Sequence, residues 1–305
     1  MSASHDVRRS TPTPEAGSLP SGGGFRGWTA RHPLRAFALI VFPLGWAILG
    51  VPALTYHGVL PGGELPVQFF ALALTVLVML PTAAWVVFVT EGRRGVRALF
   101  ARTFRWRFPL GWWAFVLLGM PVASLAVGAA LGRSLDTSDL GSVLVTGLLT
   151  GFLLPLVLVN LWEETVWAGF VQTRLEARHG LLGGALITAV GFAGIHIPMI
   201  FAADLSASTL LKSFGFLVVA AVVFRLTAGV VMRGTTGSVL AVVVLHATWN
   251  ASSGEDGVVD ELLSGGQPVL IAVLALMLLT AVAIAVVRPR LGAAGPAEGV
   301  RPPGR

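Results

Sequence analysis

Two adjacent glutamates, Glu163 and Glu164, lie within a strongly apolar part of the chain. The preceding residues 143–159 contain no charged side chain. A charged side chain near the centre of a bilayer costs about 2.5–3.5 kcal/mol even on lenient insertion scales. Two later apolar segments each contribute a histidine, His196 and His246. Because glutamate and histidine can serve as general acids, general bases and metal ligands, these four residues are candidates for hydrolytic chemistry.

Helical spacing adds one amide to this set. Asn250 follows His246 by four residues, so the two would lie on one face of a helix. Neighbouring helical residues differ by about 100° around the axis, so Glu163 and Glu164 cannot face the same way. One can point into a central cavity while the other contacts a neighbouring helix. Because the bilayer core leaves polar groups without water, we expect all five side chains to meet.

The composition places these residues in a membrane protein. Of the 305 residues, 55% are hydrophobic and only 12% are charged, and the mean hydropathy is +0.81. A soluble globular domain does not contain this much apolar residue. The chain has no cysteine, which excludes disulfides, thiolate metal sites and cysteine nucleophiles. The net charge of +6 follows the membrane topology, so no nucleic acid partner is expected.

Eight segments approach the ~20 residues that a helix needs to cross a bilayer. They are residues 37–54, 67–90, 110–131, 143–172, 182–203, 209–231, 237–253 and 268–287. We therefore predict an all-α polytopic membrane protein, a bundle of about eight transmembrane helices over residues 37–287 with the site in its interior. The site helices are about 143–172, 182–203 and 237–253. The polar residues 1–36 and 288–305 are predicted to be a disordered arm and tail.

Basic residues predict the orientation of these spans. Arginines concentrate in the N-terminal arm, in the connections after the second, fourth and sixth spans, and in the tail. The other connections carry mainly aspartate and glutamate. The positive-inside rule therefore predicts a multi-pass protein of the cell membrane, surrounded by lipid, with both termini in the cytoplasm.

The three site segments resemble the motifs of the CPBP family of intramembrane proteases, which includes the CAAX prenyl proteases and the bacteriocin-processing (Abi) proteins. The first motif is the glutamate pair, the second is Phe192-Ala-Gly-Ile-His196, and the third is His246-Ala-Thr-Trp-Asn250. The resemblance covers roughly residues 143–252. It implies a hydrolase that cleaves a peptide bond of a membrane-bound protein or peptide substrate.

The resemblance also implies a role for each motif residue. Glu163 and His196 would activate the attacking water, while His246 and Asn250 would bind the oxyanion. Glu164 would complete the catalytic set. The residue types leave a metal mechanism open as well.

In that metal mechanism, Glu163, His196 and His246 would hold a catalytic Zn²⁺ with water in the open position and a free carboxylate as base, as in a metalloprotease. The chain has no His-Glu-x-x-His run, which excludes a zincin. The sequence leaves both the zinc and the metal-free mechanism open.

One position departs from the family pattern. The family usually carries an arginine five positions after the first glutamate, where this chain has Ala168. We therefore expect another cation or hydrogen-bond donor to serve Glu164. Arg174 and Arg178 lie downstream on the same segment, near the inner surface. Arg225 is the better candidate, because it can reach across from the end of a neighbouring helix.

Other functions also fit parts of this pattern. Acidic and histidine residues at mid-membrane mark proton or ion pathways in transporters, although the chain shows no internal repeat or broken helix of the transporter kind. Ala168 makes a catalytically silent membrane scaffold of the same family a further alternative. A single intramembrane histidine can also serve only to hydrogen-bond two helices together. The combination of the three motifs favours the protease.

Overall fold

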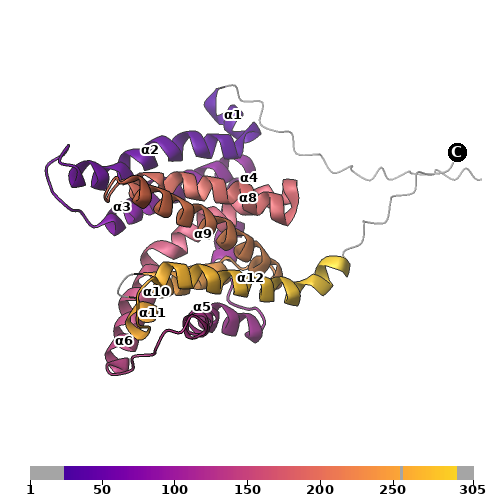
Figure 1. Cartoon of the computed structure of the whole chain (residues 1–305). Helices are drawn as coiled ribbons and strands as arrows, with labels where there is room; N and C mark the ends of the chain where they lie inside the picture. Colours follow the sequence, from indigo (N-terminus) through magenta and orange to yellow (C-terminus); the bar gives the residue numbers. More distant parts are fainter. Residues whose placement is uncertain (1–23, 255–256, 294–305) are drawn as a thin grey trace, which may run out of the picture.

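The computed structural model describes residues 24–254 and 257–293, and helices dominate both ranges (Figure 1). In chain order the elements are α1 (Phe25–Arg31), α2 (Pro33–Tyr56), α3 (Val67–Ala73), η1 (Leu74–Met79), α4 (Leu80–Thr103), α5 (Leu110–Ala130), α6 (Leu140–Thr146), η2 (Gly147–Leu153), η3 (Leu156–Asn160), α7 (Leu161–Val166), η4 (Trp167–Gln172), α8 (Thr173–Ile200), α9 (Ala207–Gly234), α10 (Val239–Ser253), α11 (Val258–Leu262) and α12 (Pro268–Ala293). The η elements are π-helical. The predicted all-α fold is confirmed for these residues.

Six helical runs in the described part are long and apolar enough to cross a membrane. They are Pro33–Tyr56, Val67–Thr103, Leu110–Ala130, Leu140–Ile200, Ala207–Gly234 and Pro268–Val287. The protein is therefore a multi-pass membrane protein, as its composition predicts. The number of such runs is smaller than the eight predicted spans, and two features of the fold account for the difference.

The first feature is a chain reversal at Gly180. The predicted spans 143–172 and 182–203 belong to one helical run of 61 residues, Leu140–Ile200. Gly180 interrupts this run with φ 70° and ψ −179°, a conformation open almost only to glycine. Beyond it the chain folds back, so a Cβ at Gly184 would collide with the backbone of Glu176. The two predicted spans therefore exist as the arms of one tight hairpin.

The second feature is the short helix α10, which corresponds to the predicted span 237–253. It has 15 residues, fewer than the ~20 that cross a bilayer. Its residues from Val239 to Thr248 are nearly all buried, so neighbouring helices enclose it. The span predicted here is therefore an interior helix of the bundle.

Parts of the predicted disordered arm and tail are helical. Residues 25–31 form α1, whose Phe25 stacks on Trp85 of α4 with ring centroids 5.7 Å apart. The next helix already begins at Pro33, so residues 25–36 are not disordered. At the other end α12 continues to Ala293, past the predicted limit at 287. Residues 1–23 and 294–305 lie outside the described ranges.

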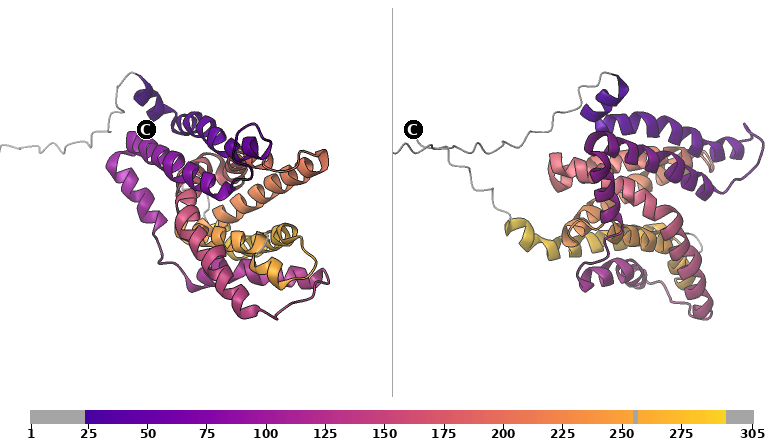
Figure 2. Two further views of the ribbon diagram at one scale, coloured as in Figure 1. Left: turned by 90° about the vertical axis from the view of Figure 1, so that its left-hand side faces the viewer. Right: turned by 180° about the vertical axis from the view of Figure 1, so that it is seen from behind.

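Two large apolar clusters flank the helix that carries the glutamates. One contains residues of α5, α9, α10 and α12, and the other contains residues of α2, α4, α8 and η4. Figures 1 and 2 show α2, α3 and α4 on one side of the molecule and α5 and α12 on the other. Ala168 belongs to the first cluster, whereas Val166, Trp167 and Phe170 belong to the second. The α7–η4 segment therefore lies at the junction of the two halves, where polar side chains are shielded from lipid.

Candidate active site

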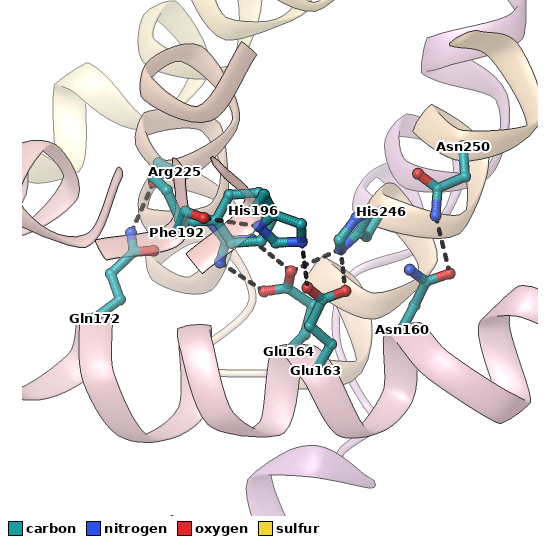
Figure 3. Close-up of polar contacts among 9 residues, drawn as sticks. All are labelled: Asn160, Glu163, Glu164, Gln172, Phe192, His196, Arg225, His246 and Asn250. Carbon is teal, nitrogen blue, oxygen red and sulfur yellow. Dashed lines mark hydrogen bonds and ion pairs between the residues drawn. The ribbon is translucent and has the colours of Figure 1, made fainter. Parts of the chain in front are cut away.

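The glutamate pair lies on α7, a single regular α-helical stretch between the π-helical stretches η3 and η4. Such π-helical insertions are frequent at functional sites. The expected angular separation of the pair gives the two carboxylates different surroundings. Glu163 is 7% exposed and faces the two histidines, whereas Glu164 is completely buried and faces α9 (Figure 3).

Glu164 is held by three hydrogen bonds. Arg225 Nη1 donates to Oε2 at 2.8 Å, and Arg225 Nη2 donates to Oε1 at 2.6 Å. His246 Nδ1 approaches the same Oε1 at 2.7 Å. Arg225 is itself fully buried. This bidentate pair matches the expectation that Arg225 serves Glu164 in place of an arginine at residue 168, and it gives the buried side chain a counter-charge.

Aromatic rings enclose the Arg225 guanidinium. Its Cζ lies 4.4 Å from the ring centroid of Phe192 and 4.8 Å from that of Phe224. Phe192 also packs on His196, with ring centroids 4.5 Å apart. The rings favour the cation through their π-electron faces and exclude water from the ion pair. Local spacing indicated nothing of this role for Phe192 beyond its position four residues before His196.

Glu163 lies between the two imidazoles. Its Oε1 is 3.6 Å from His196 Nε2, and its Oε2 is 4.0 Å from His246 Nδ1. Both separations exceed a direct hydrogen bond, but one water molecule can contact two groups at this spacing. Glu163 is thus free of the tight pairing that fixes Glu164, although the two carboxylates are neighbours in the chain.

The partners of each histidine indicate which ring nitrogen carries hydrogen. His196 Nδ1 lies 2.7 Å from the carbonyl oxygen of Phe192, which can only accept, so Nδ1 is the donor. His196 Nε2 then faces Glu163. By the same reasoning His246 donates from Nδ1 to the Glu164 carboxylate, which leaves its Nε2 for a ligand.

Local structure at the start of α10 positions its polar residues. Ser238 is the N-cap, and its hydroxyl accepts from Ala241 N at 3.2 Å. The same hydroxyl donates to the Arg105 carbonyl oxygen at 2.6 Å, which fixes this helix end to the rest of the protein. His246 and Asn250 then follow on the later turns of a helix that cannot rotate freely.

Asn250 does not join the histidine–glutamate cluster directly. Its Nδ2 is 3.5 Å from the Oδ1 of Asn160, at the end of η3 (Figure 3). Asn160 was not among the predicted site residues. The available signal was its position four residues before Glu164, which places it one helical turn away.

An apolar cavity adjoins the site. It has a volume of about 220 Å³ and lies beside His246. Its walls come from α8, α9, α10 and the start of α12: Phe192, Phe216, Leu217, Ala220, Ala221, Phe224, Trp249 and Val269. Such a cavity can accommodate apolar side chains next to the polar groups.

The predicted zinc ligands do not form a ligand set. Zinc ligands lie about 2.0–2.2 Å from the metal and converge on one point. Within the described ranges no group of three or more His, Cys, Asp or Glu side chains is arranged to hold a metal ion. The His246 nitrogen that faces Glu163 is also committed to Glu164. Glu163, His196 and His246 therefore do not fit the zinc site considered from the sequence.

The fold and the site together define a class of protein: a helical multi-pass membrane protein with a buried glutamate–histidine site beside an apolar cavity. Residues 145–252 match the family model described as "Type II CAAX prenyl endopeptidase Rce1-like". This match confirms the resemblance to the CPBP and CAAX protease family, because the three motifs lie within the matched residues. The matched domain supports an intramembrane endopeptidase of the CAAX type in general. No curated protein matches the chain at a significant level.

Proposed function

We propose that this protein is an intramembrane endopeptidase that hydrolyses a peptide bond of a membrane-associated protein or peptide. One observation carries the proposal. Glu163, a largely buried carboxylate without a tight ion pair, lies 3.6 Å from one imidazole and 4.0 Å from another. A water molecule beside Glu163 and His196 Nε2 would lie within reach of a base and an orienting acceptor.

In the proposed reaction Glu163 takes a proton from this water as its oxygen attacks the scissile carbonyl carbon. The carbonyl π electrons move to oxygen, which becomes an oxyanion. When the carbon–nitrogen bond breaks, the oxyanion returns to a carbonyl, and Glu163 gives its proton to the leaving amine. His196 keeps the water in line, because the Phe192 carbonyl holds its ring in one orientation.

His246 would act on the other side of the substrate carbonyl. In its protonated form it donates from Nε2 to the developing oxyanion, while Glu164 holds Nδ1 at 2.7 Å. Glu164 and Arg225 would thus support catalysis by fixing this imidazole. The Arg225 contact also removes the main reason to favour a catalytically silent scaffold, since Glu164 has its cation despite Ala168.

The substrate would be presented from the bilayer. The 220 Å³ cavity beside His246 would receive apolar residues next to the cleaved bond. The arginine distribution supports cytoplasmic termini in the cell membrane. We further propose that the reaction needs no metal, so phenanthroline or EDTA should leave the rate unchanged; inhibition by a chelator that Zn²⁺ reverses would contradict this mechanism.

The test uses the purified full chain in liposomes with a library of quenched fluorescent membrane peptides, prenylated and unprenylated. Cleavage in H₂¹⁸O should place one ¹⁸O in the new carboxylate, as direct attack by water requires. Glu163→Gln should abolish cleavage, whereas Glu64→Gln, in an exposed loop, should not. Wild-type rates in Glu163→Gln would refute the proposal.

A further inference from the structure

Asn160 carries a buried amide donor for which the fold provides no use. The residue is 1% exposed, and no described residue accepts a hydrogen bond from its Nδ2. Its Oδ1 is engaged, since Asn250 Nδ2 lies 3.5 Å away. Buried polar groups almost always have a partner, and an unpaired one costs free energy, more so where no water is at hand. The neighbouring residues 156–159 are all leucine or valine, which would carry no such cost.

The position of this donor suggests what it serves. Asn160 precedes Glu163 by three residues and Glu164 by four, so it lies one turn away on the same helical segment. Asn250 follows His246 by one turn of α10. The two amides therefore meet directly beside the glutamate–histidine cluster. In Figure 3 the Asn160 oxygen points to Asn250, and its nitrogen lies on the side facing Glu163 and His246.

The contact with Asn250 sets the direction of the free donor. The oxygen and nitrogen of a side-chain amide lie in one plane on opposite sides of the Cβ–Cγ bond, so fixing Oδ1 aims Nδ2 the other way. The donor is thus preorganised on the side of the glutamate–histidine cluster, where the proposed attack by water would generate negative charge. Four other buried donors lack partners among the described residues: Ser124 Oγ, Arg133 Nε, Trp167 Nε1 and Arg225 Nε. The two near the site, Trp167 Nε1 and Arg225 Nε, belong to side chains enclosed by packing or already paired.

We propose that Asn160 is a further catalytic residue, whose Nδ2 donates a hydrogen bond to the carbonyl oxygen of the scissile peptide and binds it more strongly as the oxyanion forms. This inference rests on the proposed peptidase function. No family motif quoted above includes the residue. Asn250 then acts both as an oxyanion donor and as the group that orients Asn160.

Two substitutions separate this role from packing. Asn160→Asp keeps an oxygen for Asn250 and replaces the donor with an acceptor. Asn160→Val removes both functions without adding charge. For each we expect kcat to fall by about 10²–10³-fold with KM nearly unchanged, because the bond strengthens only in the transition state. A peptide phosphonate that mimics the tetrahedral intermediate should bind more weakly by the same factor as kcat/KM falls.

The matched control is Ser124→Ala. The Ser124 hydroxyl on α5 is also fully buried without a partner among the described residues, but it lies on none of the site elements. Its removal should leave kcat and phosphonate binding unchanged. Asn160→Asp combined with Asn250→Ala should lose less than the product of the single losses, since both amides serve one oxyanion.

The outcomes distinguish the two proposals. Wild-type kcat in Asn160→Val, or a loss that merely follows the folded fraction, would overturn the role of Asn160 while leaving Glu163-dependent cleavage intact. Absence of cleavage by the wild-type chain, or full cleavage by Glu163→Gln, would overturn the peptidase function and this inference with it.

Discussion

Arg225 on α9 and Glu164 on α7 form a fully buried bidentate ion pair across 61 residues of sequence. Arg225 thus supplies a cation to Glu164, although this chain has Ala168 where the CPBP motif usually has an arginine. Because His246 also bonds Glu164, the pair connects a buried charge to an imidazole at the proposed site. The ion pair and this bond therefore join α7, α9 and α10 through buried polar contacts.

Removing the Arg225 side chain should be strongly destabilising. Arg225→Ala leaves the Glu164 carboxylate buried without a counter-charge, and breaking such a pair from one side costs about 3–5 kcal/mol. Arg225→Lys should recover only part of this, since an ammonium cannot form both bonds. Thermal unfolding in detergent measures the effect. Adding Ala168→Arg to Arg225→Ala should restore part of the stability, because residue 168 lies one turn after Glu164. If Ala168→Arg restores no stability to Arg225→Ala, an arginine at residue 168 cannot take the place of Arg225.

The two glutamates should respond differently to the same change. Glu163→Gln should abolish cleavage with little effect on unfolding, because the Glu163 oxygens are 3.6 and 4.0 Å from their nearest imidazole nitrogens. Glu164→Gln leaves Arg225 buried without a carboxylate and should lower the free energy of unfolding by about 3–5 kcal/mol. Parallel measurements of rate and unfolding test this. Equal loss of stability in both variants would contradict the assignment of catalysis to Glu163 and of the stabilising ion pair to Glu164.

The reversal at Gly180 should depend on glycine. Gly180→Ala places a Cβ at φ 70° and ψ −179°, which we expect to cost about 1–3 kcal/mol. Gly50→Ala is the control, since this glycine lies within α2 and a Cβ there meets no atom of the described ranges within 4 Å. That variant should be neutral or slightly stabilising. If both variants unfold at the wild-type temperature, the reversal imposes no strain.

The arginine distribution predicts topology. Reporter fusions after Arg105 and after Asp260 should report opposite sides of the membrane, with Arg105 in the cytoplasm. The prediction counts five crossings between these positions: α5, the two arms of the Leu140–Ile200 run, α9 and the short enclosed helix α10. A fusion after Arg178, near the reversal at Gly180, should agree with Arg105. The same side for Arg105 and Asp260 would rule out this arrangement of spans.

Local rules were sufficient where the structure depends on one segment of chain. Apolar runs predict the helices, and a separation of about 100° predicts that Glu163 and Glu164 face different surroundings. Local rules were insufficient where a turn or the length of a helix decided how a segment is placed in the bundle. From the sequence, the two arms joined at Gly180 and the enclosed helix α10 were indistinguishable from ordinary lipid-facing spans, because hydropathy does not distinguish lipid from buried protein.

The sequence by itself determined the class of membrane protein and the three polar motifs. The family resemblance added, from Ala168, the expectation that another cation or hydrogen-bond donor serves Glu164. Only the tertiary structure decided which glutamate is tied to that cation and that Asn160 lies beside Asn250. The physical reason is distance along the chain. The contacts from Glu164 to Arg225 and His246 join residues 61 and 82 positions apart, and no local spacing specifies them.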